Sequence, residues 1–390
     1  MYNYIPLEQA ADILDSYRKP VNSKERLNLI KGKPLDELFP YYGATGQVGW
    51  IDSFLTDGEY ILLGEDGAPF LNPYAEKAYI IHGKTWVNNH AHILRSKTNN
   101  EFLCYYLNYF NYKKYVSGTT RLKLTQAQMR KIPIPNIPSD EQSRIVARIE
   151  ELFSKLDKAV DKLKTTKEQL EVYRQAVMKD AFQEKENIIR LGDAIEKPRY
   201  GTSKKCDYSC TANSTAVLRI PNIDTKNGRV DSSDLKYAEF NEKELEQLSL
   251  KNGDILIIRS NGSISLVGSS AIIRKCDTDK TYAGYLMRLR ILNKEKLLPQ
   301  YLLYYLSSPD ARRYIESVAK STSGVNNINS QEISKLCVPL SSIEKQEKTV
   351  AEIEMKLSVY HEIEKSVDTV LAQMDAMRQS ILKQAFEGAL

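Results

Sequence analysis

Three of the four histidines of this 390-residue chain lie in one stretch, HGKTWVNNHAHIL at residues 82–94. His90 and His92 are two positions apart, so in a strand both side chains would point to the same face, as paired metal ligands must. However, HAHIL is also typical of a short strand that enters a core, and neither a carboxylate nor a thiol accompanies it in sequence. Core or loop histidines that make hydrogen bonds are therefore favoured over a metal site.

The same stretch contains Gly83-Lys84-Thr85, which ends like a phosphate-binding loop. That loop has the pattern G-x-x-x-x-G-K-[ST] and leads into a helix, because its glycines let backbone N–H groups surround phosphates. Here Ala78 occupies the first glycine position, and Trp86 and Val87 follow where a helix should begin. The pattern does not predict a nucleotide site.

Other catalytic patterns are incomplete. Asn72-Pro73-Tyr74 is one proline short of [DN]-P-P-[FY], the motif that holds a flipped base in amino-methyltransferases, and no glycine-rich cofactor loop accompanies it. No nucleophile elbow, zinc-protease motif or convincing nuclease carboxylate cluster is present. The cysteines are at positions 104, 206, 210, 276 and 337, and one C-x3-C pair is a weak zinc signal. We expect neither a catalytic site nor a metal, and free thiols in a reducing cytoplasm.

The bulk composition is typical of a globular protein of two or three domains. The chain is 42% hydrophobic and 27% charged, and its net charge of +5 permits a nucleic-acid partner without requiring one. Its 24 tyrosines suit polar, wet interfaces. The N-terminus lacks a signal-peptide pattern, and no run approaches the roughly 18 apolar residues of a membrane span.

An internal duplication is the most informative feature. With a shift of 204 positions, residues 135–182 match residues 339–386 without a gap at 14 of 48 positions. The ends match best, as RQAVMKDAF and RQSILKQAF. The preceding segments also correspond: FLCYYL at 102–107 resembles YLLYYL at 301–306. Each half therefore reads as a β-rich domain followed by one long helix.

Both duplicated segments carry apolar residues at alternating steps of four and three, which favours a coiled-coil seam. The alternative is an amphipathic helix packed on its own domain. We predict the following seam residues: Ile145, Ile149, Leu152, Leu156, Leu163, Leu170 and Val177 in the first helix, and Ile353, Tyr360, Ile363, Val367, Val370, Met374 and Ile381 in the second.

Polar, donor-rich loops stand out in both halves. Arg, Lys, Asn, Ser and Thr can read base edges and hold phosphates, although Asn, Gly and Ser are equally common in plain turns. The DNA-contact candidates of the first half are Tyr41, Tyr42, Thr45, Lys84, Asn88, Asn89, Thr119, Thr120, Arg121 and Lys123. Those of the second half are Arg219, Asn222, Arg259, Ser260, Asn261, Ser263, Ser323, Asn326 and Asn327.

Taken together, these segments resemble the specificity subunits of type I restriction–modification systems. The resemblance rests on YYGATGQVGWID, GEYILLGEDG, KTWVNNHAHIL and KIPIPNIPSDEQ in the first half, on GDILIIRSNGS followed by LVG in the second, and on the duplicated helices. It implies an α+β fold, in which two β-rich target recognition domains are joined by two long helices packed as an antiparallel coiled coil with pseudo-two-fold symmetry. The implied domains are 1–138 and 188–338 for recognition, and 139–183 and 339–388 for the helices.

The resemblance also implies a non-catalytic subunit that binds double-stranded DNA, each half reading one half-site of a bipartite target. Two modification subunits with S-adenosylmethionine, and in some complexes restriction subunits with ATP and Mg²⁺, would be its partners. No cofactor and no membrane are then expected for this chain itself. The alternatives are a self-sufficient DNA methyltransferase or nuclease, and a structural coiled-coil tethering protein.

Overall fold

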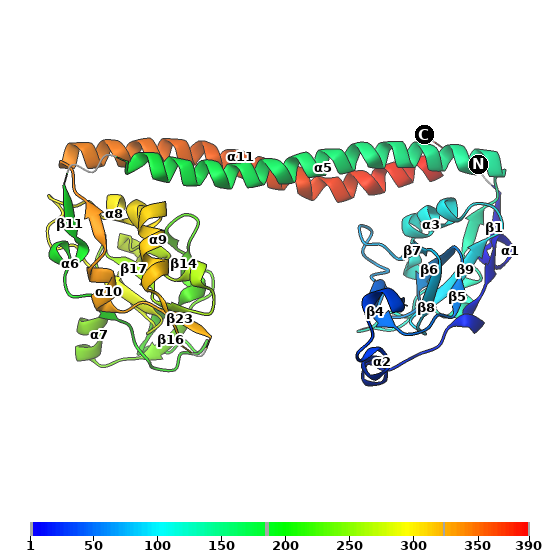
Figure 1. Cartoon of the computed structure of the whole chain (residues 1–390), viewed down its shortest axis with the longest axis horizontal. Coiled ribbons are helices and arrows are strands. Elements are labelled where there is room, and N and C mark those ends of the chain that lie inside the picture. The colour runs from blue at the N-terminus through cyan, green and yellow to red at the C-terminus, as the bar shows by residue number, and fades with distance from the viewer. Residues whose placement is uncertain (1–2, 184–186, 323, 389–390) are drawn as a thin grey trace. The chain divides into compact units, whose positions relative to one another are not determined.

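A computed structural model describes residues 3–183, 187–322 and 324–388 of the chain. It contains two compact units: unit 1 combines the residues up to Thr165 with those from Val367 onward, and unit 2 comprises Thr166–Ser366. Each unit contains one β-rich region and a part of each of two long helices (Figure 1). Within the described ranges, no helix is long and apolar enough to cross a membrane.

Two four-stranded sheets form the β-rich region of unit 1. One has the antiparallel order β2-β9-β6-β7, and the other has the order β4-β3-β8-β5, in which β3 and β8 are parallel. Strand β6 is buried at every position, as its apolar sequence YILLG predicts. The elements are β1 (Tyr4–Pro6), α1 (Leu7–Ala10), β2 (Ala11–Ile13), α2 (Ser23–Ile30), β3 (Phe39–Gly43), β4 (Gly46–Ile51), β5 (Thr56–Asp57), β6 (Tyr60–Gly64), β7 (Ala78–Ile81), β8 (Lys84–Val87), β9 (Ala91–Ser96), α3 (Asn100–Tyr109), α4 (Gln126–Met129) and β10 (Pro133–Pro135).

One four-stranded sheet and several smaller sheets form the β-rich region of unit 2. A four-stranded sheet has the order β12-β21-β17-β19, and two three-stranded sheets have the orders β16-β13-β20 and β18-β23-β22. The elements are β11 (Ile188–Arg190), α6 (Leu191–Ala194), β12 (Arg199–Tyr200), β13 (Ser214–Leu218), β14 (Ile223–Asp224), β15 (Arg229–Val230), β16 (Lys236–Glu239), α7 (Glu242–Leu248), β17 (Ile255–Ile258), β18 (Ser260–Asn261), β19 (Ser270–Ile272), β20 (Thr281–Tyr282), β21 (Leu286–Leu289), α8 (Pro299–Leu306), α9 (Pro309–Val318), β22 (Lys320–Thr322), β23 (Val325–Asn327), α10 (Ser330–Ser334) and β24 (Cys337–Pro339).

The same strand pair closes both β-rich regions. β1 pairs antiparallel with β10 in unit 1, and β11 pairs antiparallel with β24 in unit 2. β10 and β24 lie shortly before the long helices α5 (Ser139–Ala181) and α11 (Ile343–Phe386). β1 and β11, at the start of each half, therefore have the same structural role, which is to pair with the chain that leads into a long helix.

The two long helices pack antiparallel in unit 1. Ile149 of α5 shares a hydrophobic core with Leu382 and Phe386 of α11. Farther along α5, Asp157 forms an ion pair with Arg378, whose guanidinium also lies over the ring of Phe153. Because the α5 numbers rise while the α11 numbers fall, the two helices run in opposite directions here.

The same direction is found within unit 2. The Tyr360 hydroxyl of α11 donates to Glu171 of α5 at 3.4 Å, and Val177 shares a core with Ile353 and Leu357. Here too the α11 numbers fall as those of α5 rise.

The predicted seam is buried in most places but differs in phase along α11. Ile363 and Val370 are exposed, at 41% and 37%, whereas Leu357 is 8% exposed and buried. After Ile353, the next buried residue of the α11 seam is Leu357, four positions on, and not Lys356, three positions on. This shift leaves Ile363 and Val370 outside the buried seam, so the prediction for these two residues is wrong. The remaining predicted residues are buried (Ile149, Leu156, Leu170, Val177, Ile353, Tyr360, Val367, Met374) or half-buried (Ile145, Leu152, Leu163, Ile381). The predicted positions and the shifted positions of α11 both carry apolar residues, so the sequence alone could not show which set is buried.

Each helix end docks on a short helix of one β-rich region. In unit 1 the ring of Phe386 packs edge-on against Phe102 and Tyr106 of α3, at 5.4 and 5.2 Å between centroids. In unit 2 the ring of Phe182 packs edge-on against Tyr301 and Tyr305 of α8, at 5.1 and 5.2 Å. These contacts explain why the duplication is strongest at the helix ends and in the FLCYYL and YLLYYL segments.

Candidate nucleic-acid interface

Four loops of unit 1 meet at one end of its sheets. The β3–β4 hairpin meets the segment after β8, because the Asn88 amide donates to the Tyr42 carbonyl at 3.1 Å. That segment meets the turn after β6 through the Glu65 amide and the His90 carbonyl, at 2.7 Å. The same turn meets the loop 117–124, because the Leu124 amide donates to the Glu65 carbonyl at 2.7 Å. We call this set of loops the unit 1 loop cluster.

Exposed donors of the unit 1 loop cluster come from three of these loops. Thr45 lies at the tip of the β3–β4 hairpin, and Asn89 follows β8, both exposed. Thr119 and Thr120 lie exposed in the loop 117–124. All four were predicted from the sequence, and the structure brings them to one end of the unit.

Two cations of this cluster are anchored by carboxylates. Arg121 pairs with Asp66 at 2.9 Å, and Lys123 pairs with Glu65 at 3.2 Å. Both side chains are still half or more exposed, at 61% and 51%, so the pairs orient the cations without hiding them. Net energies of such exposed pairs are small, which leaves the cations available to a phosphate.

Other predicted residues of unit 1 have internal roles or lie elsewhere. Tyr41 is 3% exposed, and its hydroxyl bonds the backbone N–H and carbonyl of Val21. Asn88 is 7% exposed and accepts from the His90 amide, whereas Tyr42 is half-buried. Lys84 is exposed but begins β8, at the other end of that strand from Asn88, where it lies over the ring of Phe54. The structure therefore does not bring Lys84 into the cluster.

The predicted loops of unit 2 meet through a small sheet. β18 pairs with β23, so that Ser260 faces Asn327 and Asn261 faces Asn326. The Asn326 side-chain amide also donates to the Gly262 carbonyl at 2.9 Å. Residues about 65 positions apart in sequence are thus neighbours, and we call β18, β23 and the residues beside them the unit 2 loop cluster.

Arg259 is the most constrained cation of the unit 2 loop cluster. Its guanidinium lies 4.7 Å from the ring centroid of Tyr200 and donates to the Gly284 carbonyl at 3.2 Å. Its Nε is buried and has no hydrogen-bond partner in the described part of the chain. A guanidinium that is held by an aromatic ring and a carbonyl oxygen is pre-organised for a bidentate contact.

The remaining predicted residues of unit 2 divide between exposed and structural positions. Asn261 is half-buried and Ser263 is exposed, and the Ser263 hydroxyl lies 2.8 Å from that of Ser265. Ser260 is buried. Ser323 lies outside the described residues.

Arg219 and Asn222 link two loops inside unit 2. Asn222 is fully buried, and its amide group donates to the carbonyls of Asp231 and Asp234 at 3.0 and 2.8 Å. Arg219 pairs with the Asp234 carboxylate at 2.9 Å. Burial removes Asn222 from any surface contact, so we assign it a structural role.

Two exposed tyrosines, which no sequence pattern marked, lie beside Arg259. Tyr200 is 40% exposed, and its hydroxyl accepts from the Ser330 amide while its face supports Arg259. Tyr285 is 61% exposed, and its carbonyl accepts from the Arg259 amide. The high tyrosine content was the available signal, but it does not say which of the 24 tyrosines reach the surface.

Carboxylates pair with all three histidines of the 82–94 stretch. His82 lies 3.5 Å from Glu59, His90 lies 2.6 Å from Asp66, and His92 lies 2.7 Å from Asp15. In the described ranges no group of three or more His, Cys, Asp or Glu side chains could hold a metal ion. Gly83 has a left-handed φ of 70° and precedes β8, so Lys84 and Thr85 begin a strand and not a helix.

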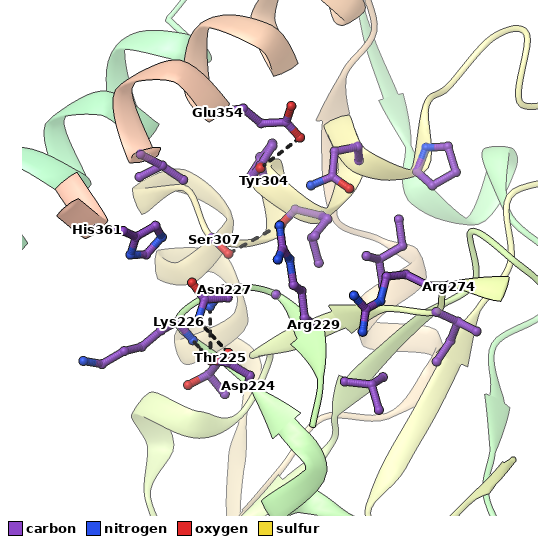
Figure 2. Close-up of a pocket in the computed structure, with 18 of the residues that line it drawn as sticks. Asp224, Thr225, Lys226, Asn227, Arg229, Arg274, Tyr304, Ser307, Glu354 and His361 are labelled. Carbon is purple, nitrogen blue, oxygen red and sulfur yellow. Dashed lines mark hydrogen bonds between the residues drawn. The ribbon is translucent and has the colours of Figure 1, made fainter. Parts of the chain in front are cut away.

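One cleft of unit 2 is lined by none of the residues predicted to bind DNA. It has a volume of about 1360 Å³ and is lined by the β14–β15 hairpin, by α8 and by α11 (Figure 2). Cations and carboxylates both line it, and the Tyr304 hydroxyl donates to Glu354 at 3.4 Å. Lys226 at its edge pairs with Glu364 at 3.0 Å. No predicted DNA-contact residue is among the lining residues.

Comparison with known proteins finds similarity to one family. Residues 9–172 match the model of the type I restriction modification DNA specificity domain. The EcoKI specificity subunit of Escherichia coli is 28% identical over 289 residues, which cover 70% of this chain and 61% of that protein. A putative type I restriction enzyme specificity subunit of Haemophilus influenzae is 28% identical over 315 residues, which cover 77% of this chain and 74% of the relative. This chain thus spans less than two thirds of the E. coli relative.

Solved structures agree on the fold. A chain from a study of assembly and conformational transition in a type I restriction–modification system has a TM-score of 0.71 at 16% identity, covering 100% of this chain and 98% of that chain. The HsdS subunit of Thermoanaerobacter tengcongensis has a TM-score of 0.55, also at 16% identity, covering 100% and 97%. The predicted fold class, two β-rich regions combined with two long helices, is confirmed.

Proposed function

We propose that this chain, a relative of the type I restriction enzyme specificity subunits, is itself a DNA-recognition subunit of a restriction–modification complex. The resemblance predicted from its sequence is confirmed. In this proposal each loop cluster reads one half of a bipartite DNA sequence. The observation that carries it is the presence of two clusters of donor-rich side chains, one in each unit, which are exposed in unit 1 and mostly half-buried in unit 2.

The chemistry of the two clusters supports base reading. Asn and Arg form bidentate contacts with adenine and guanine in the major groove, and Thr and Ser adapt to several base edges. Asn89, Thr119 and Thr120 supply such groups in unit 1, and Arg259, Asn261 and Asn326 supply them in unit 2. Lys123 and Arg121 would position the DNA backbone.

The subunit itself carries out no reaction in this proposal. Methylation and cleavage belong to modification and restriction subunits, which bring S-adenosylmethionine, ATP and Mg²⁺, and the complex acts on DNA in the cytoplasm. The helices α5 and α11 are the proposed spacer between the two recognition domains, which we place at residues 1–138 and 188–338.

Mapping N6-methyladenine across the genome of the source cell, with and without this gene, tests the function. We expect one asymmetric bipartite motif to lose its methylation when the gene is deleted. A complementing copy should restore the same motif, which controls for effects on neighbouring genes. An unchanged methylation pattern would contradict the proposal.

Purified protein separates the two alternatives. A self-sufficient methyltransferase or nuclease would modify or cleave DNA alone with cofactor added, whereas the proposed subunit should not. A tethering protein would show no sequence-selective binding, whereas the proposed subunit should bind DNA with an affinity that falls as salt rises.

A further inference from the structure

We propose that His92 is held as a doubly protonated imidazolium and that it is a positioning residue, which fixes the loop 117–124 of the unit 1 loop cluster. The protonation state stands on the geometry of the protein alone. Only its consequence for DNA reading rests on the proposed function.

The two ring nitrogens of His92 both face acceptors. The side chain is fully buried; Nδ1 lies 2.7 Å from an Asp15 carboxylate oxygen, and Nε2 lies 2.9 Å from the Leu124 carbonyl oxygen. A carbonyl oxygen can only accept, so Nε2 must donate. A neutral imidazole has one N–H, and it would be used at Nε2.

Two arrangements then fit the contact between His92 Nδ1 and Asp15. Either Nδ1 also carries a proton and donates to an Asp15 carboxylate, or Asp15 carries the proton and donates to Nδ1. The other contacts of Asp15 favour the ionised carboxylate, because all three partners are donors. They are the Ile93 amide at 3.0 Å, the Gln126 side-chain amide at 2.8 Å and Arg18 at 3.0 Å. With Asp15 ionised, Nδ1 of His92 must also donate.

A second carboxylate faces His92 at this buried position. Glu65 lies 3.8 Å from His92 Nδ1 and also pairs with Arg18 and Lys123. Two carboxylates, Asp15 and Glu65, thus face His92 and Arg18 directly, with Lys123 at the edge. A buried ion that is hydrogen-bonded and paired in this way avoids most of the cost of an isolated charge.

Leu124 connects this network to the loop. Its carbonyl accepts from His92 and its amide donates to the Glu65 carbonyl, so both backbone groups are anchored. Directly before it, Ser117 and Lys123 exchange two backbone hydrogen bonds at 3.0 and 2.8 Å and close the loop. Thr119 and Thr120 therefore project from a closed loop whose base is oriented by His92.

Nitrogen-15 NMR of the full-length chain tests the protonation state. With histidine labelled, the chain gives four imidazoles, and His82→Gln, His90→Gln and His361→Gln assign the other three. We expect both ring nitrogens of His92 to carry a proton at neutral pH. A single unprotonated ring nitrogen in His92 would overturn the imidazolium.

Substitution of His92 tests the positioning role. We expect His92→Gln to lose most of the discrimination between DNA with an intact first half-site and DNA with that half-site altered, by about tenfold or more if one or two base contacts are misplaced. Discrimination at the second half-site should be unchanged. His82→Gln is the matched control, because His82 is 70% exposed and lies at the β7–β8 turn. The probe is double-stranded DNA selected by the wild-type chain from a pool of random sequence.

Hydrogen exchange separates failure of this inference from failure of the proposed function. The Leu124 and Lys123 amides should exchange faster in His92→Gln, while the amides of α8 in unit 2 should not change. If the wild-type chain selects no DNA, the proposed function fails. The NMR and exchange results then still show whether His92 is an imidazolium that holds the loop 117–124. If the variant keeps both its discrimination and its loop protection, His92 is not a positioning residue. Should His92→Gln not fold, Asp15→Asn with the same readouts takes its place.

Discussion

At the residue scale, Arg259 is the side chain of unit 2 on which base discrimination should depend most. Its guanidinium is held by the ring of Tyr200 and by the Gly284 carbonyl, so little conformational freedom is lost when it binds DNA. We expect Arg259→Ala to weaken binding by ~1–3 kcal/mol and to relax preference at one base pair. Arg259→Lys should not restore the preference at that base pair, because an ammonium lacks the planar fork of a guanidinium. Competition binding with DNA altered at single positions measures both effects.

The matched control for Arg259 is Arg313→Ala, which removes an equal charge at a 76% exposed position of α9. An equal loss on every DNA sequence would make Arg259 a phosphate contact. Unchanged binding would remove it from the interface.

Lys77 gives a pH dependence to the stability of unit 1. It is 2% exposed, and its ammonium donates to the Pro73 and Asn108 carbonyls at 3.2 and 3.5 Å. Burial lowers its pKa from 10.5 to about 8, so between these values the unfolded chain binds more protons than the folded one. Stability therefore rises with pH in that window.

We expect the free energy of unfolding of the wild type, relative to Lys77→Met, to increase by about 2–3 kcal/mol from pH 7 to pH 10. Denaturant titrations at each pH measure it, and tyrosine titrations cancel in the difference. Lys24→Met, at an exposed position, should give a difference that does not change with pH. A flat difference for Lys77→Met would contradict the lowered pKa.

At the element scale, the phase of the α11 seam can be tested by two substitutions six residues apart. Leu357→Asp places a charge in the core of unit 2 and should destabilise it by about 3 kcal/mol or more. Ile363→Asp changes a 41% exposed side chain and should cost about 0.5 kcal/mol or less. Equal losses in thermal unfolding would support the three-residue step that the sequence suggested.

The docked helix ends should contribute separately to each unit. Phe386→Ala removes a ring that packs on Phe102 and Tyr106, and a buried Phe→Ala change costs about 3–5 kcal/mol. Cys104 belongs to the same core, and burial raises its thiol pKa to about 12. We therefore expect Phe386→Ala to make Cys104 reactive toward thiol reagents.

Phe182→Ala is the matched control for that experiment, because Phe182 packs on α8 of unit 2 and not near Cys104. Reactivity of Cys104 that rises equally in both variants would show that the two units do not unfold separately.

At the scale of the whole molecule, the two loop clusters should act on different halves of one DNA target. Thr120→Ala in unit 1 and Arg259→Ala in unit 2 should each relax preference in one half-site, and the two halves should differ. Selection from random double-stranded DNA with each variant measures this. Relaxation of the same positions by both variants would contradict a separate reader in each unit.

Much of this organisation could be predicted from the sequence. The four-three spacing in residues 139–183 and 339–388 predicts long helices, because helical periodicity depends only on near neighbours. The matching RQAVMKDAF and RQSILKQAF ends predict a duplicated scaffold. The donor-rich composition of the loops predicts which segments could contact a nucleic acid, although not which of their side chains face solvent.

Contacts across long sequence separations were decided only by the tertiary structure. His92 pairs with Asp15 at a separation of 77 residues, and Asn326 reaches Gly262 at a separation of 64. The choice of Leu357 over Ile363 for the seam depends on the neighbouring helix, because both are apolar and suit a helix equally well. By itself, the sequence determined the periodic elements, the duplication and the chemistry of the loops. Packing determined which loops meet and which donors stay exposed, because burial and pairing depend on residues that no local pattern connects.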